Sequence, residues 1–258
     1  MAVDFNNTGG YFYSVGTDLD NLTTLTVAVW VYAESFGSSG SRNVVTHWDW
    51  SADKSWTLFY STTSSQYAWE VAFDDTNNTD FQLAPNTDAT GVWQHLLGRW
   101  GASEGELSCW LDGSEGGPTP MARASISDCA AELAISGQWA FGARYNGNYF
   151  DGRISHVCGW NAFLTDEQCV ALAGGVHPLN MRRDAILFWM PLYDTSFIND
   201  MSGAGYTAAV GWSGQATADG PPVGVARYDL GWQGWLTAPV GEARIPRHPA
   251  HYNELFIY

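Results

Sequence analysis

Apolar residues recur at every second position along several short stretches of the chain, which is the pattern of β-strands. In residues 25–32 the odd positions hold one leucine and three valines, and the even positions hold Thr26, Ala28, Trp30 and Tyr32. Because both sides of this strand are largely apolar, we expect it to lie in the centre of a sheet. Further strands are predicted within residues 3–13 and at residues 43–47, 56–60, 67–73, 93–100, 106–111, 133–135, 139–143, 185–193 and 208–212.

A strand at residues 153–160 is followed by the signals of one short helix. Thr165 can cap the helix, Gln168 occupies the position of a capping-box partner, and Gly174 with Gly175 can end it. Two acidic residues in the first turn, 166 and 167, favour the same start because of the helix dipole. Strict alternation in the strand would place Ile154, His156, Cys158 and Trp160 on one face and Arg153, Ser155 and Val157 on the other.

The segment from Phe150 resembles the closing part of a known family. Phe-x-Gly-x-Ile at residues 150–154, the strand after it and Asn-x-x-Leu-Thr at residues 161–165 resemble LamG-like domains of the concanavalin A-like lectin/glucanase superfamily. Residues 25–32, 93–100 and 106–113 fit the same family in the right order, and the resemblance covers about residues 3–222. It implies an all-β, antiparallel jelly-roll β-sandwich with one short helix. The fold hosts lectins, adhesion modules, glycosidases and viral coat parts, so it does not specify an activity.

The charge of the chain argues against two classes of partner. Eleven Lys and Arg residues face 27 Asp and Glu residues, for a net charge of −16 at pH 7. Nucleic acids and anionic membranes are bound by basic surfaces, so we expect neither as a partner. The chain starts with a strand-like segment and shows neither a signal-peptide pattern nor an apolar run of transmembrane length, so we expect synthesis in a host cytoplasm.

Cysteines and acidic loops give few indications of a cofactor. Cys109, Cys129, Cys158 and Cys169 lack the close pairs of a zinc site, and we expect them to be reduced and structural. The loop at residues 74–80 is rich in Asp and Asn, whose oxygens could hold Ca²⁺. Such runs are also ordinary turn chemistry. No cofactor is therefore predicted, with calcium as the alternative.

Aromatic and amide residues in two loops are candidates for sugar binding. Aromatic rings can stack on the apolar faces of sugar rings, and amides can hydrogen-bond the hydroxyl groups. The alternative for the two tryptophans is that they fold back over the edge of the sandwich. The predicted ligand-binding residues are Trp48, Trp50, Tyr145, Asn146 and Tyr149.

Catalysis is not indicated by the spacing of the acidic residues. Retaining glucanases of the superfamily need two carboxylates on one strand face, about 5 Å apart. Glu70 is followed by another acid only at Asp74, after the predicted strand has ended. No hydrolase elbow, metalloprotease motif, phosphate loop or dinucleotide fingerprint is present either. We predict no catalytic residue and expect a protein that is not an enzyme.

The composition changes after residue 222, which is the predicted end of the sandwich domain. Residues 223–258 hold as many arginines as acidic residues and remain apolar and aromatic to the end. Such a tail is not expected to stay free in water, so it packs on its own domain or docks on another chain. Its predicted docking residues are Trp232, Trp235, Leu255, Phe256, Ile257 and Tyr258.

These observations lead to three hypotheses. The first is a structural protein on the surface of a bacteriophage virion, a capsid decoration or fibre protein that forms a homo-oligomer and binds other virion proteins. The second is a lectin module that binds cell-surface glycans, and it is compatible with the first. The third is a glycoside hydrolase or lyase of the superfamily.

Overall fold

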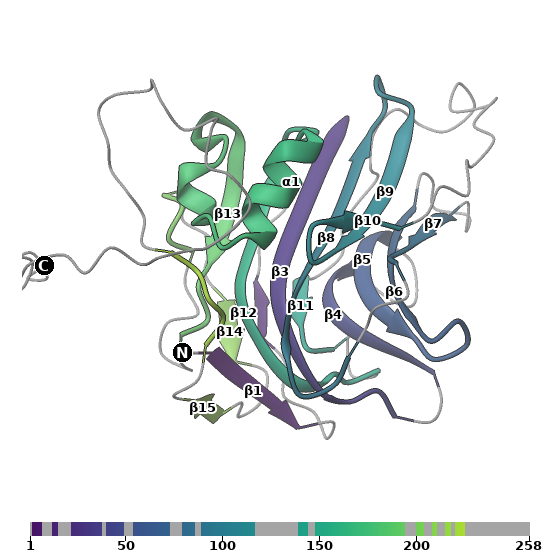
Figure 1. Cartoon of the computed structure of the whole chain (residues 1–258), viewed down its shortest axis with the longest axis vertical. Helices are drawn as coiled ribbons and strands as arrows, with labels where there is room; N and C mark the ends of the chain where they lie inside the picture. Colours follow the sequence, from purple (N-terminus) through teal and green to yellow (C-terminus); the bar gives the residue numbers. More distant parts are fainter. Residues whose placement is uncertain are drawn as a thin grey trace, which may run out of the picture. The chain divides into compact units, whose positions relative to one another are not determined.

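The described part of the chain forms two antiparallel sheets that pack against each other as a sandwich (Figure 1). Sheet A contains, in spatial order, β10 (Ser114–Glu115), β9 (Glu106–Leu111), β8 (Trp93–Gly101), β3 (Thr24–Ser35), β12 (Asp151–Trp160), β1 (Ala2–Asn6) and β15 (Gln215–Thr217), with β13 (Ile186–Met190) also paired to β12. Sheet B contains β14 (Ala208–Val210), β2 (Phe12–Ser14), β11 (Trp139–Phe141), β4 (Ser41–Trp48), β5 (Lys54–Ser61), β6 (Gln66–Ala72) and β7 (Thr79–Leu83).

This computed structural model describes residues 2–6, 12–14, 22–37, 40–48, 54–72, 79–85, 89–116, 139–143, 148–193, 200–203, 208–210, 215–217 and 220–224. Within these residues it contains one α-helix, α1 (Asp166–Ala173), and two short 3₁₀ helices, η2 (Pro178–Asn180) and η3 (Arg183–Ala185). The predicted class, an antiparallel β-sandwich with one short helix, is confirmed. No helix of this part of the chain is long and apolar enough to cross a membrane.

The main hydrophobic core lies between the two sheets. As predicted, β3 is a central strand, and its inward residues from Leu25 to Val31 are completely buried. Trp56 of β5 and Trp69 of β6 face them from sheet B and belong to the same cluster. At Gly98 of β8 an added Cβ would lie 2.2 Å from Cδ2 of Trp69. Glycine at this position therefore allows the indole ring to approach sheet A closely.

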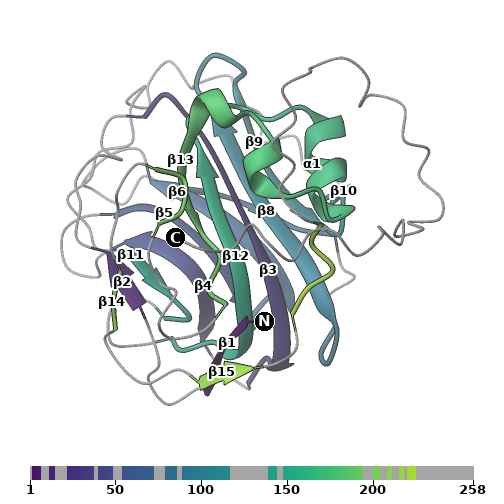
Figure 2. The same ribbon diagram turned by 90° about the vertical axis from the view of Figure 1, so that its left-hand side faces the viewer.

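A second apolar layer covers the outer face of sheet A. Figure 2 looks onto this face and shows α1 in front of the strands. Residues of β3, β8, β9, β12 and β13 pack there against α1 and η2, so sheet A is buried on both of its faces. The cluster contains Ala28, Leu97, Trp110, Cys158, Trp160, Ala162, Leu164, Cys169, Leu172, Leu179, Met181 and Trp189.

The predicted capping box of α1 is confirmed. The backbone N–H of Gln168 donates to Thr165 Oγ1 at 3.4 Å, and the backbone N–H of Thr165 donates to Gln168 Oε1 at 2.9 Å. Gly174 ends the helix, and its N–H donates to the carbonyl of Val170 at 2.9 Å. These local contacts define both ends of the helix before any tertiary packing is considered.

The predicted alternation in β12 is wrong from His156 onward. Ile154 and Val157 both point into the main core, whereas Cys158 and Trp160 point into the outer layer. Ser155 pairs with Trp30 of β3 and Cys158 pairs with Ala28, so β12 contains one extra residue between these pairs. His156 has a φ of 51°, in the left-handed region. The extra residue is a β-bulge, and it exchanges the two faces of the strand.

Most of the other predicted strands are confirmed. The hairpin of β8 and β9, the pair β4–β5 and strand β6 lie where they were expected, and Cys109, Cys158 and Cys169 are free and buried. β13 ends at Met190, three residues earlier than predicted, and Leu192 follows with a φ of 51°. Strands β7, β10 and β15 were not predicted. The predicted strand at residues 133–135, Cys129 and the tail from residue 225 onward lie outside the described residues.

Candidate functional site

The outward face of sheet B carries polar residues where sheet A carries its second apolar layer. On β5 and β6 the residues Trp56, Leu58, Trp69 and Val71 point into the core, so their neighbours in sequence point outward. Four outward residues form a row across neighbouring strands, which we call the cross-strand row: Thr46 of β4, Thr57 of β5, Glu70 of β6 and Phe81 of β7, each paired with the next in register. Three strand spacings give this row a length of about 14 Å.

Asn43 of β4 lies beside the cross-strand row. It pairs in register with Phe59 of β5, and its Nδ2 donates to Thr57 Oγ1 at 2.8 Å. Thr57 Oγ1 in turn donates to the carbonyl of Val45 at 3.4 Å. These bonds hold the amide of Asn43 so that Nδ2 is used within the protein and Oδ1 remains as the acceptor.

Two oxygens of this face have no hydrogen-bond partner. Among the described residues, Asn43 Oδ1 and Thr46 Oγ1 have no hydrogen-bond partner, although the two residues are 1% and 0% exposed. Ser55 Oγ, in a bulge at the start of β5, is also buried without a partner. A buried polar atom without a partner costs about 1–3 kcal/mol, and in native structures water or a ligand commonly supplies the bond. These atoms could therefore hydrogen-bond a ligand that carries hydroxyl groups.

Exposure increases along the cross-strand row. Thr46 and Thr57 are buried, Glu70 is half-buried, and Phe81 at the edge strand β7 is 53% exposed. Phe81 is thus an exposed aromatic ring at the outer end of a polar row. The combination of acceptors, hydroxyls and an open aromatic face is suited to a sugar, whose rings have polar edges and apolar faces.

The residues predicted from the loops are only partly described. Trp48 is the last residue of β4, and Tyr149 is half-buried, whereas Trp50, Tyr145 and Asn146 lie outside the described residues. The carbonyl of Asn148 accepts from the backbone N–H of Asn43 at 2.9 Å. The two loops therefore adjoin β4 at residues 43 and 48, about 16 Å apart along the strand. The role of these residues in ligand binding stays a prediction.

The sequence analysis missed Asn43, Thr46, Thr57 and Phe81, and it considered Glu70 only as a catalytic candidate. A signal was present in β5, where Ser55, Thr57 and Phe59 alternate with the large apolar residues of the core. That alternation identifies an outward face, but the partners on β4, β6 and β7 depend on the register between strands.

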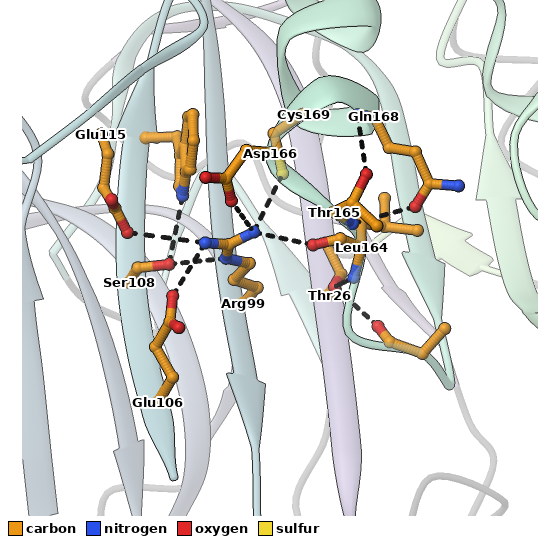
Figure 3. Close-up of polar contacts among 12 residues, drawn as sticks. Thr26, Arg99, Glu106, Ser108, Glu115, Leu164, Thr165, Asp166, Gln168 and Cys169 are labelled. Atoms are coloured by element: carbon orange, nitrogen blue, oxygen red, sulfur yellow. Dashed lines mark hydrogen bonds and ion pairs between the residues drawn. The ribbon is translucent and has the colours of Figure 1, made fainter. Parts of the chain in front are cut away.

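Among the described residues, Arg99 of β8 forms a network of three ion pairs on the outer side of sheet A (Figure 3). Its side chain is 3% exposed. Nη2 donates to Glu106 and Nη1 to Asp166, each at 2.7 Å. The remaining partners of the guanidinium group are Ser108 Oγ at 2.8 Å, the Leu164 carbonyl at 2.7 Å, Glu115 at 3.6 Å and the rings of Trp110 and Phe163.

Arg99 therefore attaches α1 to sheet A rather than offering a site. Asp166 lies in the first turn of α1 and Glu106 begins β9, so one guanidinium group joins the helix to two strands. The three acidic side chains remain partly exposed, between 40% and 66%. They are oriented toward the cation, which satisfies its donors in a position without access to bulk water.

The described residues offer neither a metal cluster nor a pair of catalytic carboxylates on the polar face. No group of three or more His, Cys, Asp or Glu side chains in this part of the chain could hold a metal ion. Glu70 is the only acid among the described side chains of the cross-strand row and the neighbouring row of Asn43 and Phe59. Most of the calcium candidate at residues 74–80 lies outside the described residues, so that alternative stays a prediction.

Comparisons with known proteins agree with this architecture. A family model described as the concanavalin A-like lectin/glucanases superfamily matches residues 6–169. The pentraxin-related protein PTX3 of Mus musculus is 29% identical over 111 residues, which are 41% of this chain and 29% of that protein. The match thus spans less than a third of the relative's length.

Two solved structures are similar in fold. One is a protein of Bacteroides ovatus whose name proposes carbohydrate binding, with a TM-score of 0.58, 15% identity and coverage of 87% of this chain and 61% of that one. The other is the CBM40 module of a Ruminococcus gnavus IT-sialidase bound to α2,3-sialyllactose, with a TM-score of 0.51, 13% identity and coverage of 67% and 96%. At these identities the similarity concerns the fold alone.

Proposed function

Because this chain belongs to the concanavalin A-like lectin/glucanases superfamily, we propose that it is a non-catalytic glycan-binding protein whose ligand lies on the outward face of sheet B. The observation that carries the proposal is the pair of buried, unpartnered oxygens, Asn43 Oδ1 and Thr46 Oγ1, in the part of the chain that the structure describes. Sugar hydroxyl groups are both donors and acceptors, so they can satisfy these atoms.

The contrast between the two outer faces supports this placement. The outer face of sheet A is occupied by α1 and η2 and is filled with apolar side chains. The outward face of sheet B instead combines Asn43, Thr46, Thr57 and Glu70 with the exposed ring of Phe81. The CBM40 module, which has a similar fold and is bound to sialyllactose, is an example of a fold of this kind that holds a sugar.

The loops next to β4 extend the proposal. Trp48, Trp50, Tyr145, Asn146 and Tyr149 were predicted as ligand-binding residues, and the loops that hold them adjoin the same strand as Asn43 and Thr46. In this proposal they add contacts at the margin of the cross-strand row. Binding of a virion component and a location on a virion surface stay predictions from the sequence.

The test is a glycan array followed by titration calorimetry, with Phe81→Ala as the diagnostic variant. Loss of the exposed ring removes the stacking surface, so we expect about tenfold weaker binding of whichever glycan binds the wild type, since aromatic contacts of this kind contribute roughly 1 kcal/mol or more. Val92→Ala is the matched control, because Val92 is 48% exposed and lies before β8, away from sheet B. Equal affinity of both variants and the wild type would contradict the placement.

A further inference from the structure

The described side chains of the cross-strand row, together with Asn43, leave several hydrogen-bond acceptors for a ligand. Nδ2 of Asn43 is already used by Thr57, which leaves Oδ1 as an acceptor. Glu70 adds a carboxylate, which has about four lone-pair sites and can accept from a ligand in addition to its other contacts. Thr46 Oγ1 can donate or accept. A ligand that fits this set must supply mainly O–H or N–H groups.

The described arginines lie outside the two polar rows, and Lys54, the first residue of β5, pairs in register with Trp48 rather than with a member of either row. Arg99, Arg153 and Arg182 form ion pairs with acids of sheet A, α1 or η3. Nε of Arg42 donates to the carbonyl of Phe36 at 3.3 Å, and its guanidinium group approaches Gly37. None of these arginines belongs to the cross-strand row or to the row of Asn43 and Phe59.

The charge of the whole chain adds to this pattern. A net charge of −16 repels anionic polysaccharides before contact, and Glu70 repels a carboxylate at short range. A carboxylated sugar would also bring acceptors to a face that already presents acceptors. Neutral hexoses and amino sugars bring hydroxyl, amide or ammonium donors.

We infer that the cross-strand row selects uncharged or amino-substituted sugars over carboxylated ones, with Glu70 as the residue that determines this selectivity. The inference rests on the proposed function and specifies the ligand class of the same site. Glu70 accepts hydrogen bonds from sugar donors at the centre of the row. Thr46 and Asn43 bind the buried end of the sugar, and Phe81 stacks on the exposed end.

The test uses pairs of probes that differ only in their charged group. Suitable pairs are tetragalacturonic acid with its carboxyl-reduced product, and 3′-sialyllactose with lactose, placed on the array beside chitosan and cellulose oligomers. For the wild-type full chain we expect neutral or amino sugars to bind about tenfold more tightly than acidic ones at low salt, and the difference to narrow as salt increases.

The diagnostic variant is Glu70→Gln, which keeps the size of the side chain and removes its charge. We expect this variant to reduce the ratio of the affinities for neutral and acidic probes about tenfold. The matched control is Glu104→Gln, because Glu104 is exposed in the turn between β8 and β9 and changes the net charge by the same amount. It should leave the preference unchanged. If Glu70→Gln does not fold, Glu70→Thr, which places a strand-forming neutral residue at the same outward position, tests the same charge.

The outcomes separate this inference from the proposed function. Tighter binding of acidic probes, or a preference that Glu70→Gln and Glu104→Gln change equally, would overturn the selectivity and leave glycan binding intact. Failure of every neutral, amino and acidic probe to bind would contradict the proposed function itself. If the protein prefers neutral or amino sugars, and Glu70→Gln weakens this preference while Glu104→Gln does not, the result would support both the selectivity and glycan binding.

Discussion

Asn43 and Thr46 combine burial with an oxygen that has no partner among the described residues. This combination is costly, because desolvation of the oxygen is not offset by a hydrogen bond. Thr57 on the next strand shows the contrast, since its hydroxyl accepts from Asn43 Nδ2 and donates to the Val45 carbonyl. In the proposed function, a sugar hydroxyl group supplies the hydrogen bond that Thr46 lacks and Thr57 already has.

Buried histidines are a second feature of single residues. Burial lowers the pKa of His95 to about 3. Burial also lowers the pKa of His156 to about 3, and charge repulsion from His177 adds to this effect. Burial lowers the pKa of His177 to about 4. His156 and His177 lie with ring centroids 5.8 Å apart, and His177 contacts Trp189 at 4.5 Å. All three are therefore neutral in the folded protein at pH 7.

These histidines should make the protein less stable in mild acid. Their folded pKa values lie below the unfolded value near 6.5, so their contribution is complete above that pH and is lost as the pH falls toward about 3 to 4. Each histidine contributes a slope of about 1.4 kcal/mol per pH unit. We expect His95→Phe, which keeps a ring against Trp30, to reduce the slope of the unfolding free energy by about that amount.

Urea denaturation at several pH values from about 6.5 to about 4.5 measures these slopes. The comparison of variant and wild type removes the contribution of the many carboxylates, which is common to both. Parallel stability curves for His95→Phe and the wild type would mean that His95 does not titrate in this range.

At the scale of elements, the guanidinium group of Arg99 and the apolar face of α1 hold the helix on sheet A. Cys169 and Leu172 of the helix join the outer layer, and Arg99 pairs with Asp166 in the first helical turn. The charged contact lies at the end of the helix where the capping box already fixes the chain direction. Together they determine where the helix begins and which side it buries.

Replacement of Arg99 by methionine should destabilise the protein by about 2 kcal/mol, because the buried Leu164 carbonyl and Ser108 hydroxyl lose their donor, whereas the partly exposed carboxylates can be hydrated. Arg182→Met is the control, since Arg182 pairs with Asp184 at the surface at 3.0 Å and should cost about 1 kcal/mol or less. Urea denaturation gives both values, and hydrogen exchange in α1 shows where the loss occurs. Equal effects of the two variants would show that the Arg99 network contributes no more than a surface pair.

Local signals predicted elements well and long-range pairing poorly. Thr165 and Gln168 identified the start of α1 because a capping box is a contact between residues three apart. The bulge at His156 was missed, because strict alternation was assumed where β12 adds one residue opposite β3. The cross-strand row was missed for a related reason: Thr46, Thr57, Glu70 and Phe81 lie on four strands whose register the sequence does not state.

At the scale of the molecule, the two sheets have different tasks. The central strands of sheet A are covered on both faces, whereas sheet B carries polar residues on its outward face. In the inferred selectivity, the net charge of −16 adds a long-range repulsion of acidic ligands. The tail, with Trp232, Trp235 and residues 255–258, lies outside the described residues, and its docking on a partner or on the sandwich stays a hypothesis.

The measurement that tests the central claim most directly is a comparison of stability and glycan affinity in Thr46→Val and Thr57→Val. Valine keeps the shape of threonine and removes the hydroxyl group. At Thr46 we expect stability to increase by about 1 kcal/mol, because an unpaired buried hydroxyl disappears, while glycan affinity falls about tenfold. At Thr57 we expect stability to fall by about 1 kcal/mol, because two hydrogen bonds are lost. A Thr46→Val protein that is less stable and binds glycan as tightly as the wild type would contradict the account.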